Sequence, residues 1–528
     1  MKKTVLTHIQ KEIPSLNSLE KPKDISFGHY ASPIAFSLAK EYRKSPMIIA
    51  DELCEKLCQN DVFESVDSIK GYINFKLSSD FLNSLSTDAL NDEDNFAKDK
   101  KETKILLEYV SANPTGPLHI GHARGAVFGD TLYRVAKHLG YKIQSEYYVN
   151  DAGNQIRLLG VSLYLGASEL LGKDVEYPEE YYKGEYIIDL AKEAIEEFGK
   201  DYFKDDSCID ELSTWAKDKM LILIKDNLKS AGIEFDSFAS EKELFKLWNE
   251  TLSKLQKNSD STYEKDGKLW LNSSKFGDEK DRVIVREDGR PTYLAGDIIY
   301  HNQKFERDFD EYINIWGADH HGYIARVKAA IKFLGYDDSK LEVILSQMVS
   351  LLKGGKPYKM SKRAGNFILM SDIVEEIGSD ALRFVFLTKK SDTHLEFDID
   401  DLKKQDSSNP IYYINYAHAR INQLVEKSSL SVEEIKDTKL ENLSDDEKNL
   451  LFNSLLLNEV LNDAYESRQL QKISEYLKNL ASLLHQFYNK NQIIGSDKER
   501  SYLKILLTVA LSIRTGLKLM GIEAKYKM

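Results

Sequence analysis

Cysteine is scarce in this sequence. The 528 residues include only Cys54, Cys58 and Cys208, and a low, odd count is typical of proteins that work in a reducing compartment. Cys54 and Cys58 lie about one helical turn apart, but no further ligands nearby complete a tetrahedral zinc site. We therefore expect no metal ion held by the protein and a cytoplasmic location.

Long apolar runs are also missing. No stretch approaches the ~20 consecutive apolar residues that a membrane-spanning helix requires, and the start, Met1-Lys2-Lys3-Thr4, lacks the apolar core of a signal peptide. Hydrophobic residues make up 42% of the chain and charged residues 30%, which is typical of a globular protein. A chain of this length exceeds one hydrophobic core, so we expect about two to four domains and no membrane partner.

Positive charge is not in excess. There are 72 Lys and Arg residues against 85 Asp and Glu residues, a net charge of −13, which argues against a generally basic nucleic-acid binder. A local basic face can still bind RNA phosphates. The common nucleotide-binding fingerprints, GxGxxG and the Walker A loop, are absent as well. A nucleotide would have to be held by a different arrangement.

The stretch from Leu106 to Arg124 combines a strand, a loop and the start of a helix. Residues 106–110 form a short run of strand type, the following loop contains two prolines and a glycine, and from His119 the apolar spacing is helical up to Gly140. The first turn of such a helix offers unpaired N–H groups and the positive end of the helix dipole, which together bind phosphate. Gly121 leaves room for a nucleotide base against this turn.

A second stretch complements the first. Residues 359–363 read Lys-Met-Ser-Lys-Arg and lie between Gly354-Gly355 and Gly365, so three cations stand on a glycine-bounded loop. Such a loop suits polyphosphate chemistry, because negative charge builds on phosphate oxygens in the transition state. Either stretch alone is more often a plain helix start or a solvated surface. Their combination in this order points to nucleotide chemistry.

These two stretches resemble the signature motifs of class I aminoacyl-tRNA synthetases. Within that class, residues 111–125, 147–155 and 359–366 resemble the arginyl-tRNA synthetase family, bacterial type. The resemblance runs from about residue 25 to the C-terminus and is weakest between about 165 and 280. Arg363 replaces the serine that usually ends the second motif. The resemblance implies ATP-dependent ligation of L-arginine to tRNA(Arg) through an arginyl adenylate, with release of AMP and pyrophosphate, in protein synthesis.

Three alternatives remain open at this point. Another class I synthetase would show cysteine zinc ligands or an apolar amino-acid pocket, and neither is visible. A small-molecule nucleotidyltransferase with a similar histidine motif would be shorter and would lack a helical region after the basic loop. A catalytically inactive RNA-binding paralogue is opposed by the intact His119, His122, Lys359 and Lys362.

The expected fold has an α/β Rossmann-like (HUP-type) parallel-sheet catalytic domain, residues 101–375, with an insertion at about 165–280. Within the insertion, helices are predicted at 187–198 and 212–228. Strands are predicted at 283–285, 312–316 and 341–345, and a helix is predicted from Ile298. These repeated units of strand, loop and helix indicate a parallel sheet with a ligand cleft at the strand C-terminal ends. An α/β domain precedes it (1–100), and a helical connector (376–404) and an all-α helical bundle (405–528) follow it. The resemblance makes the first a tRNA D-loop contact and the last the anticodon-binding domain.

ATP is expected at the two signature motifs, with Mg²⁺ bound to this substrate. Adenylate formation needs positioning and charge neutralisation rather than a general base, because the attacking carboxylate is already ionised. The resemblance implies catalytic roles for His119, His122, Lys359, Ser361 and Lys362. It implies ATP contacts from Pro117, His119, Gly121, His122, Gly317, Asp319, Gln347, Met348, Lys359, Met360 and Lys362.

Arginine recognition requires acceptors for a planar guanidinium with five donors. Asp297 is the first candidate, and Tyr293 lies four residues before it, so both reach one face if a helix has begun. The alternative for Asp297 is a plain carboxylate near a helix N-terminus. With the residues that the resemblance assigns to the α-amino end, the predicted arginine set is Glu108, Ser111, Asn113, Glu241, Tyr293, Asp297 and His321.

Contacts with tRNA are expected at both ends of the chain. Aromatic rings and amides can stack on and read unpaired bases, and the predicted tRNA-binding residues are Tyr72, Asn74, Tyr412, Tyr413, Asn415, Tyr416 and Arg420. The alternative for each tyrosine is a place in a strand or in the core of the bundle. The resemblance also implies a monomer that activates arginine only when tRNA is bound.

Overall fold

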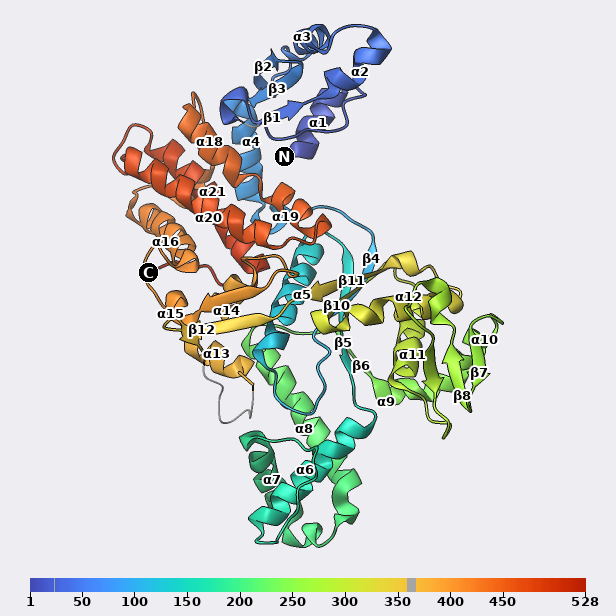
Figure 1. Cartoon of the computed structure of the whole chain (residues 1–528). Coiled ribbons are helices and arrows are strands. Elements are labelled where there is room, and N and C mark those ends of the chain that lie inside the picture. Colours follow the sequence, from blue (N-terminus) through green and yellow to red (C-terminus); the bar gives the residue numbers. More distant parts are fainter. Residues whose placement is uncertain (23, 359–366) are drawn as a thin grey trace. The chain divides into compact units, whose positions relative to one another are not determined.

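The computed structural model describes residues 1–22, 24–358 and 367–528. The chain divides into two compact units (Figure 1). One contains residues 100–404 and 520–522, and the other contains residues 1–99, 405–519 and 523–528. The expected combination of a parallel-sheet α/β domain, an N-terminal α/β region and a C-terminal helical bundle is confirmed.

A five-stranded parallel sheet forms the centre of the unit that contains residues 100–404. Its strand order is β11-β10-β4-β5-β6, with bounds Leu341–Ser346, Glu311–Gly317, Lys104–Glu108, Lys142–Val149 and Ser237–Ser240. The chain proceeds from β4 outward to β6 and then returns to β10 on the other side of β4. This reversal places the ligand crevice of such a sheet at the C-terminal ends of β4 and β10.

Helix α5 (Ile120–His138) follows β4 and packs against the sheet. The apolar residues that predicted it, Val127, Leu132 and Val135, are fully buried. Gly129 allows the close approach, because a Cβ atom there would lie 2.4 Å from the ring of Tyr109. Two further helices contact one another and continue this half of the unit, α11 (Tyr293–Glu306) and α12 (Ile324–Phe333).

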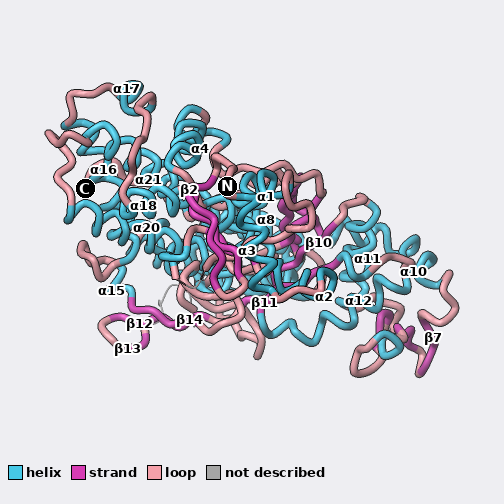
Figure 2. Tube along the Cα trace, turned by 90° about the horizontal axis from the view of Figure 1, so that it is seen from above, coloured by secondary structure: helices cyan, strands magenta, loops and turns pink. Residues whose placement is uncertain are grey.

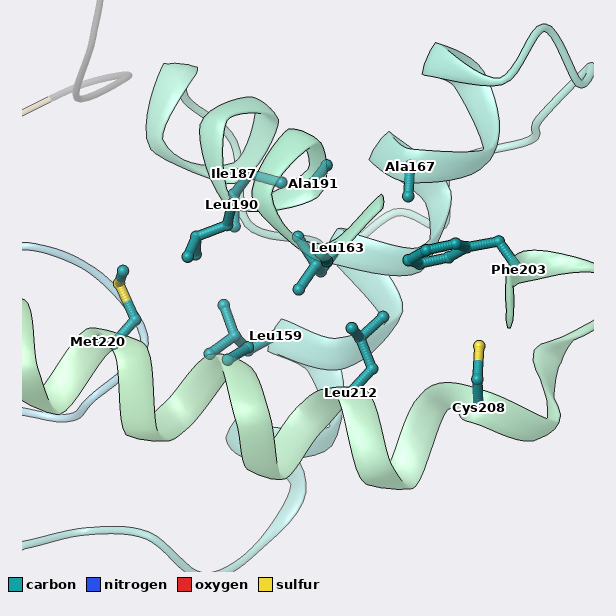
Figure 3. Close-up of a cluster of buried hydrophobic side chains, with 12 residues drawn as sticks. Leu159, Leu163, Ala167, Ile187, Leu190, Ala191, Phe203, Cys208, Leu212 and Met220 are labelled. Carbon is teal, nitrogen blue, oxygen red and sulfur yellow. The ribbon is translucent and has the colours of Figure 1, made fainter. Parts of the chain in front are cut away.

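Helices α6 (Asn154–Leu170), α7 (Glu185–Phe198) and α8 (Ile209–Ser230) form a helical subdomain with its own core. Figure 3 shows apolar side chains from these helices, with Phe203 and Cys208 from the segment between α7 and α8, pointing toward one another. Gly160 permits tight contact between α6 and α8, since a Cβ atom there would lie 1.9 Å from Ser213 Oγ. The predicted helices at 187–198 and 212–228 are confirmed.

The expected insertion at 165–280 is not one continuous element. Residues 237–240 form β6, an edge strand of the parallel sheet. This strand was missed because a segment of four residues with a serine at each end carries little strand signal. Short helices α9 (Glu241–Leu244) and α10 (Trp248–Gln256) follow. Strands β7 (Thr262–Lys265), β8 (Lys268–Leu271) and β9 (Arg282–Val285) then form a separate antiparallel sheet, so the apolar strand at 283–285 lies outside the parallel sheet.

The expected helical connector, residues 376–404, is not wholly helical. It contains the end of α13 (Met370–Ile377), α14 (Ser379–Phe386) and α15 (Ile399–Leu402), but also β14 (Leu395–Asp398), which pairs in parallel with β12 (Val349–Lys353). Strand β13 (Lys356–Pro357) completes this small sheet. Residues 395–398 alternate apolar and charged side chains, the pattern of a half-buried strand.

The second unit combines both ends of the sequence. Strands β1 (Tyr30–Ser32), β2 (Phe63–Ile69) and β3 (Tyr72–Leu77) form an antiparallel sheet, and β2 and β3 run side by side in Figure 2. Residues 1–99 do not form a separate unit, because α4 packs against α21 through a hydrogen bond of 2.7 Å between Ser86 and Thr508. The helices of this unit are α1 (Lys2–Gln10), α2 (Ile34–Tyr42), α3 (Pro46–Leu57), α4 (Ser79–Asn91), α16 (Pro410–Lys427), α17 (Val432–Lys436), α18 (Asp445–Ser454), α19 (Leu457–Glu466), α20 (Gln471–Lys490) and α21 (Glu499–Leu519).

Within residues 1–22, 24–358 and 367–528, none of the helices combines the length and the apolar character that spanning a membrane requires.

The contact between α5 and Tyr109 generates a first prediction. Gly129→Ala should lower the unfolding temperature by several degrees, because overpacking of this kind costs about 1–3 kcal/mol. Gly125→Ala on the same helix is the control, since a Cβ atom there would meet only ordinary contacts at 3.9 Å and alanine favours helix. Scanning calorimetry should show the two variants shifting in opposite directions; equal shifts would contradict this account of the contact.

Candidate active site

The loop between β4 and α5 begins with a strained turn. Val110 and Ser111 have φ angles of 69° and 43°, which is costly for a β-branched residue such as valine and is typical of functional sites. The turn places the Ser111 hydroxyl between two strands. It donates to Glu108 Oε1 at 3.0 Å and accepts the backbone N–H of Tyr148 at 3.1 Å. Ser111 therefore fixes the Glu108 carboxylate at the end of the central strand.

His119 caps the N-terminus of α5. Its Nδ1 accepts the backbone N–H of Gly121 at 3.1 Å, so a neutral ring carries its proton on Nε2. The rings of His119 and His122 stack with their centroids 3.7 Å apart. Gly121 is required here, because a Cβ atom would lie 2.9 Å from the ring of His119.

Both histidines are held in the neutral form. Burial lowers the pKa of His119, and burial together with the neighbouring His119 lowers the pKa of His122 to about 3. His122 Nδ1 is buried and has no hydrogen-bond partner within the protein. The pair therefore offers hydrogen bonds to an anion at the helix N-terminus rather than full positive charges.

Three carboxyl groups converge beside this loop. Glu108 ends β4, Glu241 follows the edge strand β6, and Asp297 lies in α11, which begins at Tyr293, five residues earlier than the sequence predicted. Gly296 lets the helix approach Glu241, since a Cβ atom there would lie 2.6 Å from Glu241 Oε1. Glu241 Oε2 is buried without a partner.

Glu108 is paired with Lys304, whereas Asp297 and Glu241 form no ion pair among the described residues. Desolvation, with repulsion from Glu108 and Glu241, raises the pKa of Asp297 to about 7, and desolvation, with repulsion from Asp151, raises the pKa of Glu241 to about 7. Lys304 and Arg326 oppose the shift of Asp297 only in part. A cation with several donors would satisfy these oxygens and lower both pKa values.

Tyr148 contacts the carboxyl groups, and Tyr293 begins the helix that carries Asp297. Tyr148 bonds to Glu241 through its hydroxyl, and burial together with Glu241 and Asp297 raises the pKa of this hydroxyl, which keeps it a donor. Tyr293 is 48% exposed. It lines a cavity of about 440 Å³ together with Asn154, Gln155, Leu158, Glu179, Glu180, Tyr181, Tyr182 and Lys183.

The loop residues before α5 face this cavity. The Asn113 amide donates to Gln155 Oε1 at 2.6 Å, so it contacts the cavity wall. Tyr186 donates from its hydroxyl to the carbonyl oxygen of Thr115 at 3.1 Å. This contact anchors the segment that leads to Pro117, which is partly buried.

The other predicted ATP contacts lie at the C-terminal ends of β10 and β11. Gly317 ends β10, and Asp319 and His321 follow it as exposed residues of a short 3₁₀ helix. Gln347 and the 75% exposed Met348 follow β11.

Arg124, which is 1% exposed, holds the segment after β11 in place. It donates to the carbonyl oxygens of Gln347 at 3.2 Å, Thr393 at 2.7 Å and Lys390 at 2.7 Å. The remaining predicted residues, Lys359, Met360, Ser361 and Lys362, lie outside the described residues.

The two candidate tRNA residues of the N-terminal region differ in exposure. Tyr72 is 39% exposed at the start of β3, and its ring meets the edge of Phe36 with centroids 5.2 Å apart. Asn74 is only 3% exposed, and its amide nitrogen lies 3.5 Å from the carbonyl oxygens of Asp67 and Tyr72. Tyr72 therefore offers a surface, whereas Asn74 is engaged by the backbone.

The candidate tRNA residues on α16 are mostly half-buried. Tyr412 and Tyr416 stack with an interplanar angle of 10°, and Tyr413 and Tyr416 both contact His485. Arg420 bonds to the hydroxyl of Tyr416 and lies 3.9 Å from the ring centroid of Tyr488. Asn415 is buried, and its side-chain oxygen accepts the backbone N–H of Lys525 at 2.9 Å. Asn415 is thus part of the packing of this unit.

Several site residues carried no role in the sequence analysis. Tyr148 and Gln155 lie in the segment 147–155, whose resemblance to the synthetases could have indicated them. Lys304, which bonds to Glu108, gave no signal, because a single lysine in a helix is ordinarily exposed. Among the residues that the structure describes, no group of three or more His, Cys, Asp or Glu side chains is arranged to hold a metal ion.

The sequence matches three domain families of known proteins. Residues 2–77 match the arginyl tRNA synthetase N-terminal domain, residues 85–426 the catalytic domain of tRNA synthetases class I (R), and residues 414–528 the DALR anticodon binding domain. Arginine–tRNA ligases of Nitratiruptor sp. and Aliarcobacter butzleri are 64% and 61% identical, over 100% and 99% of this chain and of their own lengths.

A solved structure extends the match to the fold. Thermus thermophilus arginyl-tRNA synthetase superimposes with a TM-score of 0.78 at 20% identity and covers 100% of both chains. The catalytic-domain match spans more than half of the sequence, and the curated relatives align with it from end to end. The chain therefore belongs to the class I tRNA synthetases of the arginine (R) family.

Proposed function

We propose that this protein ligates L-arginine to tRNA(Arg) with ATP, through an arginyl adenylate, and releases AMP and pyrophosphate. The observation that carries the proposal is the convergence of Glu108, Glu241 and Asp297 beside the helix N-terminus that bears His119 and His122. The full-length similarity to arginine–tRNA ligases supports the same reaction.

Arginine fits the acidic site at both of its ends. Its guanidinium presents five donors in a plane and cannot lose its charge. It therefore matches Asp297 and Glu241, whose pKa values are raised to about 7 in the absence of a bound cation. Glu108, held by Ser111, is placed to receive the α-amino group. Tyr293, Asn113 and His321 complete the proposed arginine site.

In this proposal, ATP binds at the end of the β4–α5 loop where α5 begins. The neutral His119 and His122 donate to its phosphates at the N-terminus of α5, where the helix dipole favours anions. Pro117, Gly121, Gly317, Asp319, Gln347 and Met348 border the nucleotide. The roles of Lys359, Met360, Ser361 and Lys362 rest on the sequence alone. Mg²⁺ enters bound to ATP, because it retains water and is commonly held through substrate phosphates.

The chemistry requires positioning more than proton transfer. The arginine carboxylate attacks the α-phosphorus of ATP, the bond to the bridging oxygen breaks, and pyrophosphate leaves with the electron pair. Donors at the helix end and cations of the basic loop stabilise the charge that develops. In the second step a ribose hydroxyl of the tRNA terminus attacks the activated carbonyl, and AMP leaves.

In this proposal, residues near both ends of the sequence contact the tRNA. Residues 1–100 contact the D-loop through Tyr72, with Asn74 shaping its strand. Residues 405–528 bind the anticodon through residues on α16: Tyr412, Tyr413, Tyr416 and Arg420, with Asn415 as a packing residue. We further propose a cytoplasmic monomer that activates arginine only when tRNA is bound.

The function is tested by charging bulk tRNA with each standard amino acid in turn, with ATP and Mg²⁺. Arginine alone should be attached. Attachment of a different amino acid would refute the acidic pocket as the specificity site, and no attachment of any amino acid would favour an inactive RNA-binding paralogue.

Asp297→Asn tests the guanidinium contact. Loss of one partner of a buried charge pair costs about 2–5 kcal/mol, so kcat/KM for arginine should fall by roughly 10²-fold or more with little change in the KM for ATP. Glu306→Gln makes the same chemical change on α11 in a residue that pairs with Lys254 at the surface, and it should leave the kinetics unchanged. Undiminished use of arginine by Asp297→Asn would place the guanidinium elsewhere.

The raised carboxyl pKa values predict a pH dependence of arginine binding. Below pH 7, Asp297 and Glu241 are largely protonated in the free enzyme, so arginine affinity should rise as the pH increases through 7 and level off above about 8. Binding near pH 7 should release protons, because the guanidinium lowers both pKa values. Calorimetric titration of the tRNA-bound enzyme in buffers of different ionisation enthalpy measures this release. Affinity that stays constant from about pH 6 to 8, without proton release, would exclude the assigned carboxyls.

A further inference from the structure

The inner face of α11 carries a buried ammonium below the acidic site. Asp297, His301 and Lys304 are spaced by four and three residues, so they share one helix face. Lys304 is 0% exposed. It bonds to Glu108 Oε2 and donates to Asn314 Oδ1 at 2.8 Å, and its Nζ lies 4.2 Å from the ring centroid of Tyr300. Nothing in the proposed reaction uses this group directly.

Lys304 begins a hydrogen-bond chain with a fixed direction. An ammonium only donates, so the Asn314 oxygen faces Lys304 and the Asn314 amide nitrogen faces His301 Nε2, at 3.1 Å. His301 Nε2 must therefore accept. The proton of this ring is on Nδ1, which lies 2.8 Å from the backbone carbonyl oxygen of Asp297 and donates to it. Burial, together with Lys304, lowers the pKa of His301 to about 3, which keeps the ring neutral and the direction unambiguous.

This chain connects the two ends of the proposed arginine site. It starts at Glu108, the carboxylate for the α-amino group, and ends at the backbone of Asp297, the carboxylate for the guanidinium. Asn314 is the register partner of Glu108 on the neighbouring strand β10. The chain thus links β4, β10 and α11 by side chains that are buried at every step.

The hydrogen bonds of Lys304, Asn314 and His301 are not needed merely to attach α11 to the sheet. The end of the same helix has a second anchor on β5. Arg307, which follows the last residue of α11, donates to both oxygens of Glu146 at 2.6 and 2.7 Å. Tyr300, whose ring also contacts Lys304, donates to Glu146 Oε1 at 2.9 Å. A buried ion pair adds little stability over apolar residues of similar volume. The second set of buried polar residues therefore calls for a role other than docking the helix.

We infer that Lys304, Asn314 and His301 form a spacer that sets the distance between the α-amino and guanidinium ends of the site, and so selects the length of the amino-acid side chain. This inference rests on the proposed function and goes beyond it, because none of the three residues contacts arginine in the proposed site. They are positioning residues. One methylene is ordinarily discriminated only about 10–200-fold, so a small change in this distance is enough to erode selectivity.

Asn314→Leu is the main test, because leucine has a similar size and removes both bonds in the middle of the chain. The assay is tRNA charging by the full-length enzyme with arginine, with homoarginine (one methylene longer) and with norarginine (one methylene shorter). The ratio of kcat/KM for arginine to that for each analogue should fall about 10-fold. The loss should lie mainly in the KM for arginine, and the KM values for ATP and tRNA should stay within about twofold of the parent enzyme.

A second variant and a control separate selectivity from folding. His301→Gln leaves the pair of Lys304 and Glu108 intact and can still accept from Asn314, but it loses the bond to the Asp297 carbonyl, so a smaller fall of about threefold is expected. Arg307→Lys weakens the contact with Glu146 at the end of α11, in which neither Asn314 nor His301 takes part. It should lower the unfolding temperature while the selectivity ratios stay unchanged.

The outcomes distinguish the inference from the proposed function. Unchanged ratios in folded Asn314→Leu or His301→Gln overturn the spacer, and so does an equal fall in Arg307→Lys, which would show that any loosening of α11 has this effect. If the parent enzyme charges no tRNA with arginine, the proposed function fails instead.

Discussion

Burial of the Glu108 carboxylate is the constraint around which the catalytic unit is arranged. A carboxylate at the end of a central strand loses its water and must be compensated by donors. Ser111 supplies one donor from a strained turn, and Lys304 supplies another from α11. Each of these donors requires a further element in a fixed place, namely the loop that leads to α5 and the helix that carries Asp297. The same buried group therefore positions both the turn before α5 and the helix that carries Asp297.

The sequence predicted those parts of the fold whose signal is local. The change from strand to helix spacing between Leu106 and Val135 is a period change within one segment, and the structure follows it. Helices α7 and α8 were also predicted from the sequence, whereas α6 was not. Strand β6 was not, because a short edge strand with polar side chains is defined by its partner β5 rather than by its own residues.

The site could be predicted only in part, because some of its residues are brought together from distant parts of the sequence. His119, Gly121 and His122 lie in one motif, and their stacking and capping follow from helix geometry. The convergence of Glu108, Glu241 and Asp297 joins residues far apart in the sequence, and only the resemblance to a family suggested it. The left-handed conformation of Val110 could not be anticipated, because neither residue 110 nor 111 is glycine. The burial of Lys304 could not be predicted, because the neighbouring residues in the sequence do not indicate a buried charge.

The division of the chain has a consequence for its synthesis on the ribosome. Residues 1–99 are made first, but the helices that complete their unit begin at residue 405. Helix α4 ends at Asn91 and α21 begins at Glu499, so about 400 further residues must be made before α21 exists to cover α4. At the usual elongation rate of roughly 5–20 residues per second this delay lasts about 20–80 s. The parallel-sheet unit is made in the interval and is nearly continuous in sequence. The unit that contains the first residues to be made is therefore the last to be completed.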